Sequence, residues 1–246
     1  WGAQVIISLF GAIPYIGESL ELWVRGDYYI SGITVSRFFA LHVVALPLVL
    51  IALVFLHLVA LHEVGAGNPE GVDIEKYLDD DGVPLDSVPF FPYKVLNALV
   101  AIGVFMTVFS IIMFFFPEGG GYFIEMANFQ EANPLVTPDH IAPVWYYAPF
   151  YTMLRAIPDP LGGLIVMASA VAIFFIVPWL DRSKVASIRY KGIYSKIAIT
   201  LFGVSFLTLG YLGTVGVTEI RKTMSVICTV IYFAYFLLMP IYSKYE

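Results

Sequence analysis

The sequence predicts an all-α membrane protein, a helical bundle with about five transmembrane helices and a short pair of interfacial helices. Two observations lead to this fold class. Hydrophobic residues make up 59% of the 246 residues and charged residues only 13%, which is too apolar for an ordinary soluble protein. The apolar residues also gather in runs of roughly 20, the length of helix that crosses a bilayer, and not in the alternating segments of a membrane barrel.

Five apolar runs are long enough to be transmembrane helices. The connection after the third run carries five basic residues against one acid, so the positive-inside rule places it in the cytoplasm. The sides then alternate, which puts residues 117–159 and the residues before 38 on the outer side; Arg221 and Lys222 disagree mildly with this arrangement. The predicted spans are 38–61, 94–116, 160–180, 194–215 and 223–242.

Two outer segments differ from the spans. Residues 5–23 are amphipathic but interrupted by Pro14 and Gly17, which predicts a pair of short helices lying in the membrane interface. Residues 117–159 contain the aromatic, proline-punctuated sequence TPDHIAPVWYYAPFY. We expect a long non-helical loop there, and loops of that length are often functional.

Charge and cysteine content exclude some classes of function. Most of the formal charge of -6 comes from one acidic stretch, residues 73–86, so nucleic acid is not an expected partner. The single cysteine, Cys228, lies in an apolar run and offers neither a disulfide framework nor a cysteine metal site. No signal peptide is visible after Trp1, and we expect an N-terminal part to be missing.

Two histidines lie inside the first predicted span. His42 and His57 are fifteen residues apart, with no charged residue between them. Fifteen helical steps end about 60° beyond four full turns and rise about 22 Å, so both imidazoles project to roughly one side at two depths. An imidazole is a good axial ligand for haem iron, although histidines satisfied by polar neighbours remain the alternative. Pro47, between them, is expected to bend the helix.

Three segments resemble cytochrome b of respiratory cytochrome bc complexes. They are WGAQVIISLFGAIPYIG, RFFALHVVALPLVLIALVFLH followed by LHEVGAGNPEG, and TPDHIAPVWYYAPFYTMLRAIP. The resemblance covers essentially the whole chain in order and is weaker after about residue 200. It implies that residues 1–62 form the end of the third family helix, the interfacial helices and the haem-bearing helix, and that 63–246 form the four-helix C-terminal region, with the outer loop at 117–159.

The resemblance implies two b-type haems, each with one axial ligand from this chain. His42 corresponds to the ligand of the low-potential haem near the outer face and His57 to that of the high-potential haem near the inner face. The second ligands in the family lie on the second helix, which this sequence lacks; His62 and His140 cannot replace them. The N-terminal part of cytochrome b is therefore an expected partner, either as the rest of this protein or as a separate chain.

The resemblance also implies a quinol-oxidation pocket at the outer face. An apolar, aromatic pocket with few polar groups can hold a quinone ring and restrict the access of water. Packing in the interfacial aromatic belt is the alternative role for any one of these aromatics. Catalytic positions are expected at Pro143, Trp145, Tyr146, Tyr147 and Tyr151, and further quinol-binding positions at Gly2, Val5, Ile6 and Ile141.

The expected quinone-reduction site lies at the inner face. His62 corresponds to the family histidine that contacts quinone there, with Phe90 and Ala66 at neighbouring wall positions. A solvated histidine at a helix end is the alternative. For Arg155 we favour a structural role, as an interfacial anchor or an ion-pair partner of the loop.

The sequence departs from the family pattern in three places. Val144 replaces the glutamate of the common Pro-Glu-Trp-Tyr motif, which puts the usual proton exit in doubt. Asn97-Ala98 replaces a Lys-Asp pair near the inner site. The histidine spacing is fifteen, whereas many respiratory relatives have fourteen. For the missing glutamate we expect another acid to carry protons outwards, and the nearest in sequence are Glu125, Glu131 and Asp139.

The resulting prediction is a subunit of a quinol–cytochrome c reductase in the inner membrane of a bacterium, with a mitochondrial location less favoured. The expected partners are a Rieske iron-sulfur protein and a c-type cytochrome, in a dimeric complex within the lipid bilayer. A transporter or channel subunit whose histidines line a proton path is one alternative, and it would show no haem absorbance. A di-haem quinone reductase anchor is another, but it would not need the outer PVWY loop.

Overall fold

The structure is a computed structural model that describes residues 1–65, 67–73, 76–119, 126–136, 138, 141–185 and 187–245. The chain divides into two compact units, one made of Trp1–Gly65 with Ala132–Glu246 and the other of Ala66–Glu131. Helices and their connections make up the described residues, and the only pairing of extended backbone among these residues is an isolated bridge between Leu78 and Pro84.

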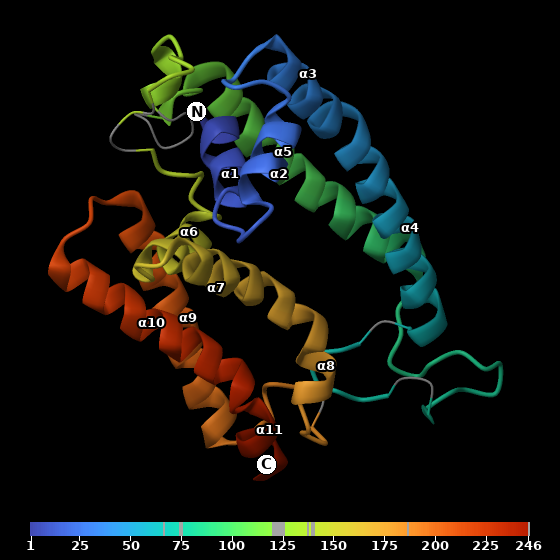
Figure 1. Cartoon of the computed structure of the whole chain (residues 1–246). Coiled ribbons are helices and arrows are strands. Elements are labelled where there is room, and N and C mark those ends of the chain that lie inside the picture. Colours follow the sequence, from blue (N-terminus) through green and yellow to red (C-terminus); the bar gives the residue numbers. More distant parts are fainter. Residues whose placement is uncertain are drawn as a thin grey trace. The chain divides into compact units, whose positions relative to one another are not determined.

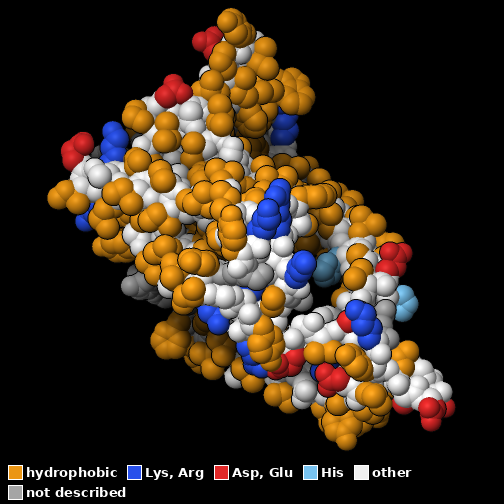
Figure 2. Space-filling model, turned by 90° about the horizontal axis from the view of Figure 1, so that it is seen from below, with side chains coloured by type: hydrophobic (Ala, Val, Ile, Leu, Met, Phe, Trp, Pro, Cys, Tyr) orange, Lys and Arg blue, Asp and Glu red, His pale blue; other side chains and the backbone are white. Residues whose placement is uncertain are grey.

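Five helices in the described part of the chain are long and apolar enough to cross a membrane, as predicted (Figure 1). Each overlaps one predicted span, so the all-α membrane fold is confirmed. Hydrophobic side chains cover most of the face shown in Figure 2. The long helices are Gly32–Val64 (α3 Gly32–Ala40, η1 Leu41–Ala45, α4 Leu46–Val64), Phe90–Phe115 (η3 Phe90–Lys94, α5 Val95–Phe115), Pro160–Leu180 (α7 Pro160–Ala172, η6 Ile173–Ile176, α8 Val177–Leu180), α9 Ile193–Thr214 and α10 Glu219–Leu237.

The first long helix begins earlier than predicted, at Gly32. The N–H of Ser31 donates to the hydroxyl of Thr34 at 3.2 Å, so a side chain satisfies a backbone group at the start of the helix. Thr34 is fully buried and also donates to the carbonyl of Arg25, at 2.7 Å. The apolar run alone could not show this start, because polar capping residues determine it.

Two short helices precede this span, as predicted. They are α1, Gly2–Phe10, and α2, Gly17–Arg25, and they contact each other and α3. The approach is close at Gly17, where an added Cβ would lie 2.6 Å from the carbonyl oxygen of Gly11. A larger residue at position 17 would therefore push the two helices apart. Their position in the membrane interface remains a prediction.

The smaller unit carries α5 and the acidic connection that precedes it. In this connection Asp79 closes a turn, because its Oδ1 accepts from the backbone N–H groups of Asp81 and Val83 at 3.0 and 2.8 Å. The Asp79 side chain thus stabilises the backbone of its own turn. A short 3₁₀ turn, η5, spans Met126–Phe129.

The helices after residue 148 pack around an aromatic core. The ring of Phe202 lies 5.3 Å from that of Tyr232 and 4.6 Å from that of Tyr235, centroid to centroid. Tyr232 is fully buried and donates its hydroxyl to the carbonyl of Ala170 at 2.8 Å, which satisfies the polar end of a buried ring. The buried cluster comprises Met153, Ala170, Ile173, Leu209, Tyr232, Phe236 and Met239.

The expectation of a non-helical outer segment over 117–159 is wrong at its C-terminal end. Residues Ala148–Ala156 form a helix, α6, with Pro149 in its first turn, where the absence of an N–H is harmless. Its buried residues Ala148, Thr152 and Ala156 recur every four positions and face α9 and α7. The four-residue spacing is present in the sequence, but the prolines and aromatic residues around it favoured a loop over a helix.

Close approach fixes α6 against the neighbouring helix α9. An added Cβ at Gly213 would lie 2.5 Å from the carbonyl oxygen of Ala148 and 2.9 Å from the Thr152 hydroxyl oxygen. We therefore expect Gly213→Ala to destabilise the packing of α6 by about 1–3 kcal/mol, the usual effect of overpacking. Thermal unfolding of the purified complex would measure the loss.

Gly203 provides the matched control, since it lies on the same helix and a Cβ there would meet nothing within 4 Å. Gly203→Ala should leave the melting temperature unchanged or raise it, because alanine favours helix. Equal melting temperatures for the two variants would contradict the close contact.

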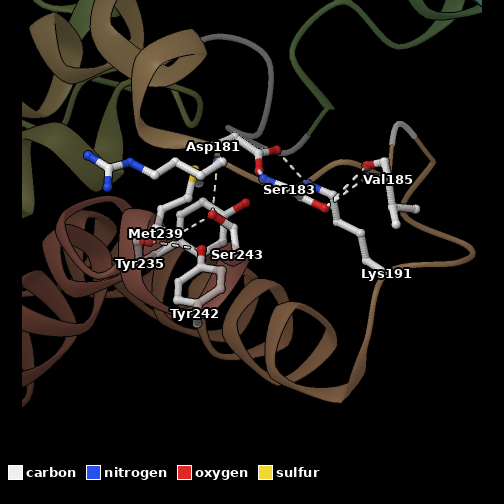
Figure 3. A network of polar contacts seen from close by, with 9 residues as sticks. Asp181, Ser183, Val185, Lys191, Tyr235, Met239, Tyr242 and Ser243 are labelled. Carbon is white, nitrogen blue, oxygen red and sulfur yellow. Dashed lines mark hydrogen bonds and ion pairs between the residues drawn. The ribbon is translucent and has the colours of Figure 1, made fainter. Parts of the chain in front are cut away.

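The connection before α9 is tied to the C-terminal end of the chain (Figure 3). Lys191 pairs with Asp181 at 2.5 Å, and the N–H of Ser183 donates to the same carboxylate at 3.0 Å. The N–H of Arg182 donates to Ser243, which follows the short helix α11, Met239–Tyr242, and begins the 3₁₀ turn η7, Ser243–Tyr245. Lys191, one of the basic residues in this predicted cytoplasmic loop, is thus paired with an acid of the same loop.

The ion pair makes part of the stability depend on pH. Burial raises the pKa of the Asp181 carboxyl, but the hydrogen bonds from Lys191 and Ser183 and the positive charge of Lys191 outweigh it and hold the pKa below its usual value. A lowered folded pKa gives stability that is present above the ordinary carboxyl pKa, about 4, and is lost as the pH falls through the lowered value. Asp181→Asn should therefore lower the melting temperature at pH 7, and by less as the pH falls below 4.

The acidic loop offers a control for this measurement. Asp86→Asn removes an exposed carboxylate and should not change the melting temperature appreciably at either pH. A difference between Asp181→Asn and the native complex that stays constant across the pH range would contradict the role of the pair.

Candidate functional site

The two intramembrane histidines lie on one continuous helix (Figure 1). His42 lies in the π turn η1 and His57 in α4, and both are exposed. No hydrogen bond of either imidazole lies within the described part of the chain, and their role as ligands remains a prediction.

The helix that carries these histidines is largely uncovered by the described part of the chain. None of the residues in the most apolar part of the helix Gly32–Val64 is buried among the described residues. The described residues also contain no group of three or more histidine, cysteine or acidic side chains that could hold a bare metal ion. One imidazole at each of two depths would suit one haem at each depth, with the imidazole as one of its protein ligands.

The PVWY segment forms a turn that leads into α6. The N–H of Tyr147 donates to the carbonyl of Val144 at 2.9 Å, and Tyr147 is the residue before the helix. The rings of Trp145 and Tyr146 lie 5.5 Å apart, and those of Tyr146 and Tyr147 lie 4.7 Å apart. These three side chains remain between 51% and 75% exposed, so they form an uncovered aromatic surface.

The residues around this turn are less exposed. Ile141 and Pro143 are half-buried, and Tyr151, one turn into α6, is half-buried as well. The guanidinium carbon of Arg155 lies 4.4 Å from the centre of the Tyr151 ring, a cation–π contact. The predicted catalytic residues from Pro143 to Tyr151 are thus brought together on one turn and the start of one helix.

Hydrogen bonds to α9 hold this helix in place. The hydroxyl of Thr152 donates to the carbonyl of Leu209 at 2.7 Å, and Nη2 of Arg155 donates to that of Leu212 at 2.8 Å. Arg155 thus contacts a backbone carbonyl and an aromatic ring, which agrees with a structural role, but the described residues show no ion pair of Arg155 with an acid. Thr152 was not anticipated; its place one helical turn after Ala148 was the available signal.

Other predicted quinol-site residues lie on α1. Gly2 begins this helix, Ile6 is 52% exposed and Val5 is half-buried. Among the described residues, no hydrogen bond or ring contact joins them to the turn at 143–147, so their common pocket remains a prediction.

The predicted inner-site residues are dispersed over the chain. His62 lies exposed in the last turn of α4. Phe90, which is 75% exposed, and Asn97 lie on η3 and α5 in the other unit.

Glu131, one of the acids considered for proton exit at the outer face, is exposed. Four residues singled out from the sequence lie outside the described residues: Ala66, Glu125, Asp139 and His140.

Two family descriptions together match nearly the whole chain. Residues 1–149 match "Cytochrome b(N-terminal)/b6/petB" and residues 131–233 match "Cytochrome b(C-terminal)/b6/petD". The chain belongs to the cytochrome b family. It is 51% identical, over its whole length, to cytochrome b of Allochromatium vinosum, of which it covers 61%, and 40% identical to cytochrome b of Rhodospirillum rubrum, of which it covers 58%.

A solved structure agrees with this assignment. A chain of a hyperthermophilic respiratory Complex III matches with a TM-score of 0.87 and 32% identity, covering all of this chain and 63% of that one. The chain thus spans about three fifths of the length of these cytochrome b relatives. The fold that carries His42 and His57 is therefore the cytochrome b fold.

Proposed function

We propose that this chain is the part of a quinol–cytochrome c reductase that carries one axial ligand for each of two b-type haems and most of the quinol-oxidation site. The observation that carries the proposal is the pair His42 and His57, both unpartnered among the described residues, on one span of a chain of the cytochrome b family. Membership of that family favours this proposal over a histidine-lined transporter.

His42 holds the haem near the outer face and His57 the haem near the inner face, each through one ring nitrogen. When bound, the haems supply one-electron transfer across the membrane, and the protein orients them and controls access. Each needs a second axial ligand from the N-terminal part of cytochrome b. That part is a partner of this chain, whether or not it is covalently continuous with it.

Quinol binds beside the turn at 143–147. Trp145, Tyr146 and Tyr147 present ring faces and polar edges at its surface, and α6 holds the turn rigidly through Thr152 and Arg155. Pro143 and Ile141 contribute apolar surface, with Gly2, Val5 and Ile6 completing the wall from α1. A rigid apolar wall orients the quinone ring and restricts the access of water to it.

Within such a complex, one electron from quinol would be accepted by a Rieske iron-sulfur partner and then a c-type cytochrome subunit, and the other by a quinone held near His62. Proton release outside and uptake inside then store energy. The complex is dimeric and lies in the inner membrane of a bacterium, in keeping with the bacterial relatives.

Haem reduction driven by quinol tests this function. Quinol added to the oxidised complex should reduce the b haems, and removal of the Rieske subunit should prevent reduction through the outer site. Unchanged haem reduction without that subunit, with the inner site blocked by an inhibitor, would contradict the proposal.

The same assay tests the expected proton exit that replaces the missing glutamate at position 144. Amide replacements of Glu125 and Glu131, and Asp139→Asn, are made one at a time. A slower quinol oxidation in one of them identifies the acid. Unchanged rates in all three would contradict an exit through these acids.

A further inference from the structure

The helix that carries both histidines is not a regular α-helix. Over Leu41–Ala45 it forms the π turn η1, and the N–H of Leu46 donates to the carbonyl of Leu41, five residues earlier, where an α-helix would bond four residues back. Backbone on both sides remains α-helical, so the turn is a single widened turn with one more residue than its neighbours. His42 lies inside it.

Pro47 accounts for the position of the π turn. A proline has no N–H to donate, and its ring clashes with the carbonyl four residues earlier, here that of Val43. Widening the preceding turn moves that carbonyl away from the ring. Kinks in helices commonly occur both at prolines and at π turns. The position of Pro47 in the sequence thus explains why the π turn lies at Leu41–Ala45.

The extra residue changes the angle between the two histidines. Fifteen regular steps would place His57 about 60° beyond four turns from His42, but with one residue taken up by the π turn the separation is that of about fourteen steps, roughly 40° short of four turns. The two geometries differ by about 100°, which is enough to point an imidazole toward a different neighbour.

We infer that the π turn at Leu41–Ala45 positions His42 for its haem by absorbing one of the fifteen residues that separate it from His57. The pair then projects toward one side with the phase of a fourteen-residue spacing. This inference rests on the proposed haem ligation and deepens it, because it says which backbone feature sets the direction of the outer ligand.

Changes in the length of the helix test the inference. Deletion of Val44 in a chain that also carries Pro47→Ala, which removes the ring clash, should turn the π turn into an α turn and leave the phase of His42 unchanged, so the complex should keep both haems. One alanine inserted after Leu50 adds a residue where no change in the π turn compensates for it. The insertion should rotate the histidines by about 100° relative to each other, so one haem should be lost. Haem content comes from the reduced-minus-oxidised spectrum, and ligand geometry from the low-spin haem signals in electron paramagnetic resonance.

Loss of a haem on deletion of Val44, or retention of both haems in the insertion variant, would overturn the inference. If the deletion variant does not assemble, a cryo-EM map of the native complex decides: a bond from Leu46 to the Leu41 carbonyl with both haems bound supports the inference, and a regular α-helix there contradicts it. Failure of the inference is distinct from failure of the proposed function, because haems retained in both His42→Leu and His57→Leu would refute the ligation itself.

Discussion

His42→Leu is expected to leave the complex with only the inner haem, and His57→Leu with only the outer one. Leucine has no lone pair for iron, so each substitution leaves one haem an axial ligand short in an apolar site. Electron transfer between the two quinone sites should stop in both variants. A redox titration of the purified complexes measures which of the two b-type components remains.

An exposed residue of the same helix gives the matched control. Val49→Leu changes an exposed position between the histidines and should retain both haems at native content. Two-haem titrations in both histidine variants would refute the assignment of the ligands. Loss of both haems in Val49→Leu would show that the helix tolerates no substitution and that the haem losses say nothing specific about His42 and His57.

His62→Leu is expected to slow the reoxidation of the inner haem by quinone, by about a hundredfold, the lower end of what a positioned general acid contributes. An imidazole at the end of α4 can hydrogen-bond a quinone carbonyl and pass on a proton to it. Asn97 could hold the ring but could not donate that proton. Haem content and haem reduction from the outer site should stay near native values.

Neighbouring substitutions separate a specific role of His62 from a general effect at the helix end. Glu63→Gln, at the adjacent exposed residue, should reoxidise the inner haem at the native rate. His62→Gln retains hydrogen bonding without a titratable proton, so it should bind quinone and still react slowly. Native rates in His62→Leu would show that His62 is only a solvated residue.

The spans could be predicted well because their cause is local. A run of roughly 20 apolar residues has few alternatives to a transmembrane helix, so each predicted span overlaps an observed one. The ends were less accurate, since polar contacts set them: Thr34 extends the first helix to Gly32, and the side chain of Thr218 accepts from the N–H of Arg221 and starts α10 at Glu219.

Parts of the candidate site could not be predicted, because they depend on packing between distant segments. The helix α6 was missed, and so was the bond from Thr152 to Leu209, which joins residues 57 positions apart. The π turn was missed as well; the expected bend at Pro47 was the only signal in the sequence. The histidine spacing was visible, but regular helical steps gave the wrong angle for a helix that contains a π turn.

We propose that this chain provides one axial histidine to each of two b-type haems. The most direct test is a reduced-minus-oxidised visible spectrum of the native complex, recorded as the potential is lowered stepwise. The proposal predicts b-type bands that appear in two steps, with two haems for each copy of this chain. A complex that contains this chain and shows no b-type bands, or only one haem for each copy, would contradict it.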